Sequence, residues 1–212
     1  MYKHPLLERD KMSPKEALDI LMEGNHRFEN NLAAHKDMQS LVQLTKDKQH
    51  PFVSVLSCSD SRAPVEMLFD QALGDVFSVR LAGNIASTLA IGSLEFSTKY
   101  LGSKLVMVLG HTGCGAVKAA CDDFTGGHIG ELIDYIRPAV KQSGCEVAQK
   151  NSKNSSFVQE ICEASVRLQL SQITSHSDIV SQMLEQKQIG IVGGVYDIAT
   201  GKVSLLEDTI KL

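Results

Sequence analysis

The chain has 212 residues, a formal net charge of −4 and 22% charged residues, values typical of one globular domain. This charge excludes the basic surface that nucleic-acid binding requires, and no apolar run is long enough to span a bilayer, so neither partner is expected. Residues 3–11 (KHPLLERDK) carry charges where a secretory signal has an apolar stretch, which predicts a cytoplasmic protein.

The N-terminal stretch predicts one helix on a polar tether. Residues 13–16 (SPKE) place Ser at the N-cap, Pro in the first turn and Glu at the third helical position, which is a capping box. Apolar residues follow at helical spacing, with Gly24 as a weak point. Residues 30–51 are polar and predict a loop with a short helix near 40–46. We therefore expect residues 1–50 to form a helical arm whose helix docks on a second subunit.

From residue 51 onward, short apolar runs alternate with helical patterns. Strands are expected at 52–57, 76–81, 105–109, 189–195 and 203–206, and helices at 64–69, 87–100, 116–121, 129–140, 157–173 and 179–186. Strands that alternate with helices in this way are typical of a parallel sheet. The sequence therefore predicts an α/β fold with a mostly parallel central sheet, in a single domain of residues 1–212 whose α/β core is residues 51–212.

Metal-binding side chains follow two of the predicted strands. Cys58 and Asp60 come after the first strand, and His111 and Cys114 come after the third. Because the carboxyl ends of parallel strands share one crevice, these side chains should converge there. Two thiolates and one imidazole suit Zn²⁺ and leave a fourth position for water, substrate or the Asp60 carboxylate. The set therefore predicts a catalytic zinc site. A structural zinc site usually has four protein ligands from paired knuckles, and only one such arm exists here.

Arg62 lies two residues after Asp60 and can hold its carboxylate by a bidentate pair, which keeps the carboxylate off the metal. The alternative is an ordinary surface ion pair, worth about 0–1 kcal/mol. A phosphate-binding loop is excluded, because Gly115 is followed by Ala116 and Val117 instead of Lys and Ser or Thr. The predicted pocket walls, Phe77, Ala82 and Phe96, are small or apolar. Hydroxide formed on zinc in such a pocket suits a small electrophile such as carbon dioxide.

Five segments together carry a family resemblance. They are residues 58–62 (CSDSR), 69–75 (FDQALGD), 79–84 (VRLAGN), 111–115 (HTGCG) and 192–197 (VGGVYD). In this set the chain resembles the β-class carbonic anhydrases over essentially its whole length. The resemblance implies a four-stranded parallel core with an added strand, helices on both faces, and dimers that can pair into tetramers. It also implies that the N-terminal helix extends to the partner subunit and that the active sites lie at the dimer interface.

The resemblance also implies roles for individual residues. It makes Cys58, His111 and Cys114 the zinc ligands, Asp60 with Arg62 the catalytic pair, and Gln71 the residue that hydrogen-bonds bicarbonate across the interface. We expect Gln71, Phe77, Ala82 and Gly83 to contact the substrate. The prediction is a zinc-dependent homodimer or homotetramer that hydrates carbon dioxide to bicarbonate by zinc-hydroxide attack.

Two other functions remain open at this point. One is a non-catalytic zinc-binding module on the same fold, because a fold does not determine a function. The other is hydrolysis of a different small heterocumulene such as carbon disulfide.

Overall fold

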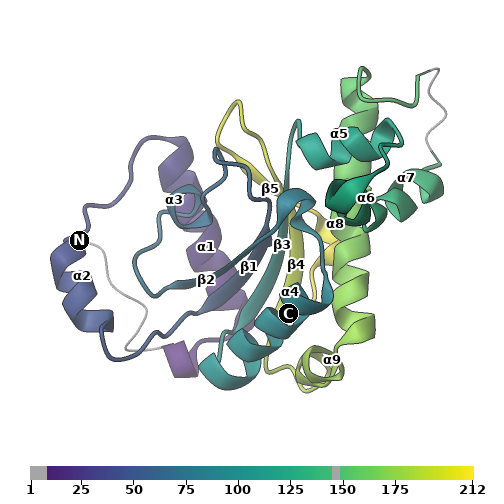
Figure 1. Ribbon diagram of the computed structural model, residues 1–212. Helices are drawn as coiled ribbons and strands as arrows, with labels where there is room; N and C mark the ends of the chain where they lie inside the picture. Colours follow the sequence, from purple (N-terminus) through teal and green to yellow (C-terminus); the bar gives the residue numbers. More distant parts are fainter. Residues whose placement is uncertain (1–8, 145–148) are drawn as a thin grey trace.

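The computed structural model describes residues 9–144 and 149–212, and a single sheet runs through its centre (Figure 1). Its five strands are β1 (Val53–Ser57), β2 (Val76–Arg80), β3 (Leu105–His111), β4 (Gly190–Tyr196) and β5 (Val203–Leu205), in the order β2-β1-β3-β4-β5. The first four strands are parallel to their neighbours, and β5 pairs with β4 in the antiparallel direction. The prediction of a mostly parallel sheet is confirmed.

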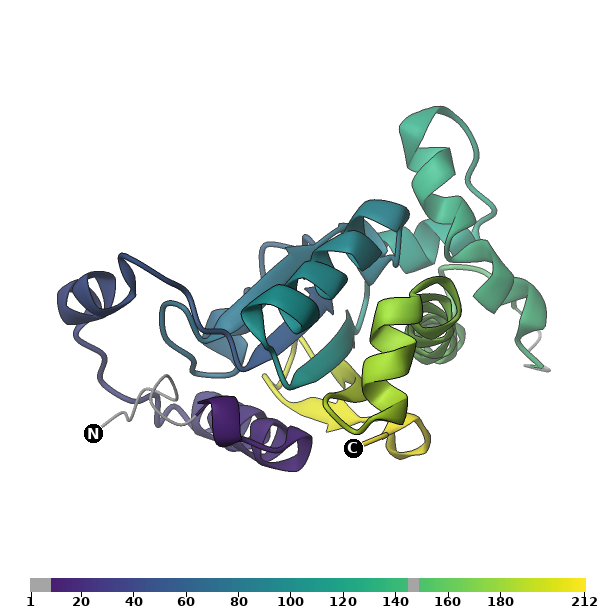
Figure 2. The ribbon, with the colours of Figure 1, turned by 90° about the horizontal axis from the view of Figure 1, so that it is seen from below.

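Helices cover both faces of this sheet, as expected (Figure 2). One face is covered by α1 (Pro14–Glu29), and the other by α4 (Thr88–Glu95), α8 (Ser155–His176) and α9 (Asp178–Glu185). Alternate residues of each central strand serve the two cores, because successive side chains of a strand point to opposite faces. Val53 and Val55 of β1 therefore belong to the core on the α1 side of the sheet, while Leu56 belongs to the core on the other side.

The N-terminal helix α1 starts as the sequence predicts. The Ser13 hydroxyl accepts from the Glu16 N–H at 3.2 Å, and the Glu16 carboxylate accepts from the Ser13 N–H at 2.8 Å. The apolar residues Ala17, Leu18 and Leu21 are buried against the sheet of their own chain. Docking of this helix on a second subunit stays a prediction, but its apolar face already has a partner within the chain.

Gly24 is required where it occurs, although it weakens the helix. A Cβ atom at this position would lie 1.8 Å from the carbonyl oxygen of Phe69. Helix α1 therefore lies so close to the loop that follows α3 (Val65–Leu68) that a residue with a Cβ atom does not fit at position 24.

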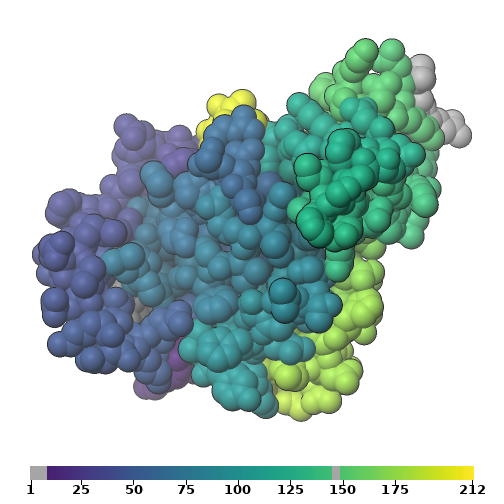
Figure 3. Space-filling view, in the orientation of Figure 1, coloured from purple at the N-terminus to yellow at the C-terminus, as the bar shows by residue number. Residues whose placement is uncertain are grey.

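Beyond α1, the chain leaves the core as a segment that we call the arm, residues 30–51. It contains the predicted short helix, α2 (Met38–Thr45), which starts at the N-cap residue Asp37. The space-filling view shows α2 projecting at the left edge of the molecule (Figure 3). Its residues Met38, Val42 and Leu44 are exposed hydrophobic side chains.

One predicted helix is wrong. The sequence predicts a single helix over residues 129–140, whereas the structure has α6 (Gly127–Asp134) and α7 (Arg137–Gln142). Pro138 lies in the first turn of α7. Proline lacks the N–H that a helix interior uses and is tolerated in a first turn, so it starts a second helix instead of ending the first. Helix α5 (Gly115–Cys121) precedes this pair, and the polar connector that follows includes residues 145–148, which lie outside the described residues.

The predicted helix over residues 87–100 changes its winding partway. After α4, residues Phe96–Leu101 continue as a π-helical segment that ends at Gly102.

None of the helices in residues 9–144 and 149–212 is both long enough and apolar enough to cross a membrane.

Candidate metal centre

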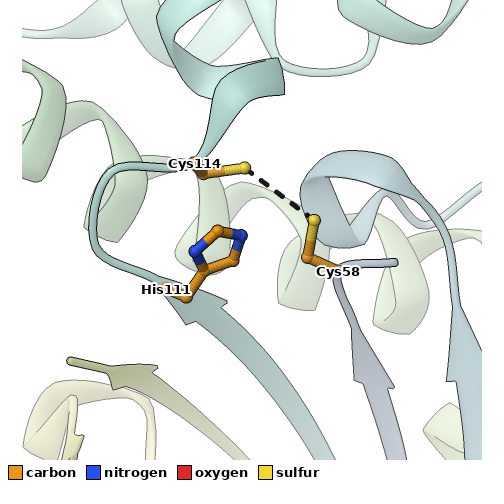
Figure 4. A group of neighbouring side chains, drawn as sticks. All are labelled: Cys58, His111 and Cys114. Carbon is orange, nitrogen blue, oxygen red and sulfur yellow. Dashed lines mark hydrogen bonds between the residues drawn. The ribbon is translucent and has the colours of Figure 1, made fainter. Parts of the chain in front are cut away.

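Three side chains meet where β1 and β3 end. Cys58 directly follows β1, His111 is the last residue of β3, and Cys114 precedes α5. Their ligand atoms lie within 4.8 Å of one another, and all three residues are buried. Figure 4 shows the two thiols and the imidazole close together, with 4.0 Å between the two Sγ atoms. The structure therefore brings together three of the predicted metal ligands.

Strand register places these residues at one edge of the sheet. Ser57 of β1 lies beside Leu109 of β3, so both strands deliver their next residues to the same side. The chain then passes from His111 to Cys114 through a tight turn, in which Gly113 has a φ of +68°. Glycine adopts this conformation without the steric cost that other residues carry.

The His111 ring presents one nitrogen to the two thiols. Its Nδ1 lies 3.0 Å from the carbonyl oxygen of Thr112, so we assign the ring proton to Nδ1. Within the part of the chain that the structure describes, the buried Nε2 has no hydrogen-bond partner. A buried nitrogen without a partner is costly, whereas it is the usual ligand atom of a metal-bound histidine whose other nitrogen donates to a carbonyl. The donor set therefore fits a metal ion.

The two thiols also suit metal ligation electrostatically. The hydrogen bond with Cys114 lowers the pKa of Cys58 well below its ordinary value, against the opposing effect of burial. The N–H of Gly83 donates to the Cys58 sulfur at 3.3 Å and favours the thiolate further. The pKa of Cys114 is raised, first by its hydrogen bond with Cys58 and then by burial. One thiol is thus ready as an anionic ligand, and metal binding would release the proton of the other.

Asp60 and Arg62 form a bidentate pair beside these ligands. The Arg62 Nε and Nη2 atoms donate to the two Asp60 oxygens at 2.9 and 2.8 Å, and the Arg62 backbone N–H adds a third bond at 2.9 Å. The Arg62 side chain is the main reason that the pKa of Asp60 lies well below its usual range. Asp60 Oδ2 is 3.9 Å from His111 Nε2, so the pair borders the cluster. In this arrangement the carboxylate faces the guanidinium, and its role as a fourth ligand stays a prediction.

Arg80 is a residue whose role the sequence reasoning missed. It is the last residue of β2, and its guanidinium donates to the carbonyl oxygens of Cys58 and Asp60 at 3.1 and 2.6 Å. These bonds join the end of β2 to the loop that follows β1, beyond the last paired residues of the two strands. Arg80 lies in the VRLAGN segment, which contributes to the family resemblance, but its contact depends on strand order and cannot be predicted from the segment alone.

The structure separates the predicted substrate-contacting residues into three places. Ala82 and Gly83 lie in a short turn, Ala82–Asn84, beside Cys58. Phe77 of β2 pairs with Ser54 of β1. Ser54 lies three residues before the end of β1, so Phe77 is about 10 Å along the sheet from the strand ends that carry the ligands. There its ring packs against Phe96, with 6.4 Å between ring centroids.

Gln71 lies in a third place. Its carboxamide nitrogen donates to the Phe69 carbonyl at 2.6 Å, and the residue lines a cavity of about 400 Å³ together with Lys36, Met67 and Leu73. Among the described residues that line this cavity, none is one of the three clustered ligands. The contacts of Phe77, Ala82, Gly83 and Gln71 with substrate remain predictions.

A buried set of two cysteines and one histidine at the carboxyl edge of a parallel sheet, bordered by a carboxylate–guanidinium pair, defines the site of an α/β metalloenzyme. Comparison with known proteins identifies the family. Residues 53–203 match the carbonic anhydrase family. The carbonic anhydrase of Mycolicibacterium smegmatis is 33% identical over 195 residues, covering 91% of this chain and 93% of that protein. Carbonic anhydrase 2 of Mycobacterium tuberculosis is 31% identical over 203 residues, with the same coverage of 91% and 93%.

Solved structures agree with the sequence relatives. The β-carbonic anhydrase CafA of Aspergillus fumigatus superposes with a TM-score of 0.72 at 26% identity, covering 80% of this chain and 81% of that one. A Coccomyxa β-carbonic anhydrase, solved in complex with acetazolamide, gives a TM-score of 0.71 at 28% identity over 89% and 86%. The chain belongs to the β-carbonic anhydrases, which are lyases, and the family predicted from its motifs is confirmed.

Proposed function

We propose that this chain catalyses the reversible hydration of carbon dioxide to bicarbonate and a proton, with zinc held by Cys58, His111 and Cys114. The observation that carries the proposal is the buried ligand group, in which two thiols converge with an imidazole nitrogen that has no hydrogen-bond partner among the described residues. Thiolate and imidazole are ligands that zinc prefers, and three protein ligands leave a position open for chemistry. Zinc bound by this set acts as a Lewis acid that acidifies water at neutral pH.

The residues around the ligands prepare the site for that reaction. Arg62 holds both oxygens of Asp60 and keeps this carboxylate ionised at the border of the ligand group, with Oδ2 3.9 Å from His111 Nε2. The carboxylate is then available to accept a hydrogen bond from the attacking water. Arg80 fixes the backbone of the loop that carries both Cys58 and Asp60. Gly83 donates to the Cys58 sulfur, which reduces the negative charge on that ligand.

The site is completed, in this proposal, by Gln71 of a second copy of the chain. In the described part of the chain Gln71 lines a cavity that none of the three ligands lines, so a contact of Gln71 with bicarbonate at this site requires another subunit. The rim of the Gln71 cavity offers exposed apolar side chains for such an interface, among them Met67, 64% exposed, and Met38 of the arm, 50% exposed. We propose a homodimer that can pair into a tetramer, and we retain the cytoplasm as its location.

The test of the reaction is stopped-flow hydration of carbon dioxide on protein of known zinc content. We expect about one zinc per chain and rapid hydration that Cys114→Ser abolishes together with most of the bound zinc. Cys121→Ser is the matched control, because Cys121 is also buried but lies outside the ligand group. Zinc-loaded wild-type protein without hydration activity would leave the non-catalytic module as the better description.

The test of the assembly is light scattering combined with the same assay. Met67→Asp places a charge on the exposed rim of the Gln71 cavity, and should yield monomers that keep zinc and lose activity. A monomeric variant with wild-type turnover would show that Gln71 of a second subunit is not needed.

A further inference from the structure

The peptide group that orients His111 belongs to Thr112, and strand β4 holds this residue through the main chain. The Thr112 carbonyl oxygen lies 3.0 Å from His111 Nδ1. The Thr112 backbone N–H donates to the carbonyl oxygen of Tyr196, the last residue of β4, at 2.9 Å. Because Tyr196 pairs with His111 in the parallel register, this bond continues the contact between β3 and β4 one residue past the end of β3.

The Thr112 hydroxyl adds two bonds to the turn that joins β4 to β5. It donates to Asp197 Oδ1 at 3.3 Å and accepts from the Ile198 backbone N–H at 3.1 Å. Asp197 Oδ1 also accepts from the Ala199 N–H at 2.9 Å, so the turn fixes the direction of this acceptor. A hydroxyl that donates and accepts at the same time has one defined orientation, and the Thr112 side chain is therefore fastened to the turn.

This turn is itself fastened to α1. Asn25 of α1 is only 2% exposed. Its side chain donates to the Gly201 carbonyl at 3.0 Å and accepts from the Val203 N–H at 2.8 Å. A continuous series of hydrogen bonds thus runs from α1 through the turn to Thr112.

The orientation of the Thr112 peptide matters because of the chemistry of histidine ligands. Which nitrogen a histidine offers to a metal is set by the hydrogen bond that its other nitrogen makes. If the Thr112 peptide rotated, His111 Nδ1 would lose its acceptor. Both the place of the ring proton and the direction of Nε2 would then be free to change.

We propose that Thr112 and Asp197 are positioning residues for His111, and that they hold its Nε2 towards the two thiols. The inference rests on the proposed ligation of zinc by His111. Neither Thr112 nor Asp197 is one of the three clustered ligands. They act through the Thr112 carbonyl, which the turn between β4 and β5 keeps in place.

The test is the zinc affinity of Thr112→Val, measured by competition between the zinc-loaded protein and a chelator. Valine keeps the β-branched shape of threonine, so the substitution removes chiefly the hydroxyl. We expect the Kd for zinc to rise roughly 10- to 100-fold, the range for a residue that orients a metal-bound histidine. Thr112→Ser keeps the hydroxyl and should bind zinc as the wild type does. In the Thr112→Val background, Asp197→Ala should cause no further rise.

A second measurement reports on the His111 ring directly. In zinc-loaded protein with ¹⁵N-labelled histidine, the Nδ1–H signal of His111 should be protected from exchange with water in the wild type. Thr112→Val should lose this protection, whereas a role limited to closing the hairpin would leave it intact. Thr174→Val is the matched control, because the Thr174 hydroxyl also bonds to main-chain carbonyls but lies on α8. It should change neither zinc affinity nor the His111 signal.

The outcomes separate this inference from the proposed function. If His111→Ala weakens zinc binding and Thr112→Val does not, or if Thr112→Ser is as weak as Thr112→Val, the positioning role is wrong while ligation by His111 stands. Additive effects of Thr112→Val and Asp197→Ala would also contradict it. If His111→Ala itself binds zinc like the wild type, the proposed ligation fails. Should Thr112→Val not fold, Asp197→Ala alone removes the acceptor of the same hydroxyl and should raise the Kd for zinc and expose the Nδ1–H.

Discussion

The two parts of the proposed active site are built in different ways. Cys58, His111 and Cys114 are delivered by the ends of two neighbouring parallel strands, so strand register alone brings them together. Gln71 sits on a loop whose position depends on a helix about 45 residues earlier in the chain and on a buried ion pair of Asp70 with Arg27. The first part depends on the pairing of two strands of the sheet, whereas the second is only as well placed as the packing of α1. Changes in these two parts should therefore have different consequences.

The largest effect on turnover in zinc-replete protein is expected at Arg62. Asp60 Oδ2 lies 3.9 Å from His111 Nε2. Without the guanidinium of Arg62, the Asp60 carboxylate is free to move closer to the ligands. Arg62→Ala should keep its zinc and lose hydration activity by about 10²–10⁴-fold, the range of a lost catalytic group. Arg62→Lys should restore little, because an ammonium cannot make the bidentate contact.

The matched control is Arg167→Ala in α8, which removes a similar bidentate pair between Arg167 and Asp208 of the short turn Glu207–Thr209. It should leave zinc content and turnover at wild-type levels. Wild-type activity in Arg62→Ala would mean that the pair with Asp60 is only scaffolding.

A smaller effect, on stability, is expected where α1 meets the Gln71 loop. Helix propensity predicts that Gly24→Ala stabilises by about 1 kcal/mol. The collision with the Phe69 carbonyl predicts the reverse, a net loss of roughly 1–3 kcal/mol in the free energy of unfolding. Urea denaturation distinguishes the two. Gly92→Ala in α4 is the control, because a Cβ atom there meets nothing within 4 Å and should stabilise.

The last expected effect is a pH dependence that does not involve the metal. Burial raises the pKa of Asp75 from its ordinary value of 3.8 to about 7. The folded state binds this proton more tightly than the unfolded state, so the stabilising contribution is present below about pH 4 and is lost as the pH rises towards 7. The difference in unfolding free energy between wild type and Asp75→Asn, measured by urea denaturation at several pH values, should therefore change across this interval. A constant difference would show that folding does not raise the pKa of Asp75.

The part of the molecule that depends on strand ends could be predicted from the sequence. The alternation of apolar runs and helices is enough for a parallel sheet, and the segments CSDSR and HTGCG stand directly at strand ends. The contacts of Arg80 and Asp70 could not be predicted, because they depend on which segments lie side by side in space. The same holds for Gly24, which appears as a defect in a helix until its neighbour Phe69 is known. The break between α6 and α7 was missed because Pro138 is compatible with either a helix end or a helix start.

The most direct test of the account is a crystal structure of zinc-loaded protein with anomalous scattering at the zinc edge. We expect one strong peak at bonding distance from both Sγ atoms of Cys58 and Cys114 and from His111 Nε2, about 2.0–2.3 Å. We also expect Asp60 to remain on Arg62 and the fourth position to be open to solvent. A peak at any other site, or a set of ligands that lacks one of these three residues, would contradict it.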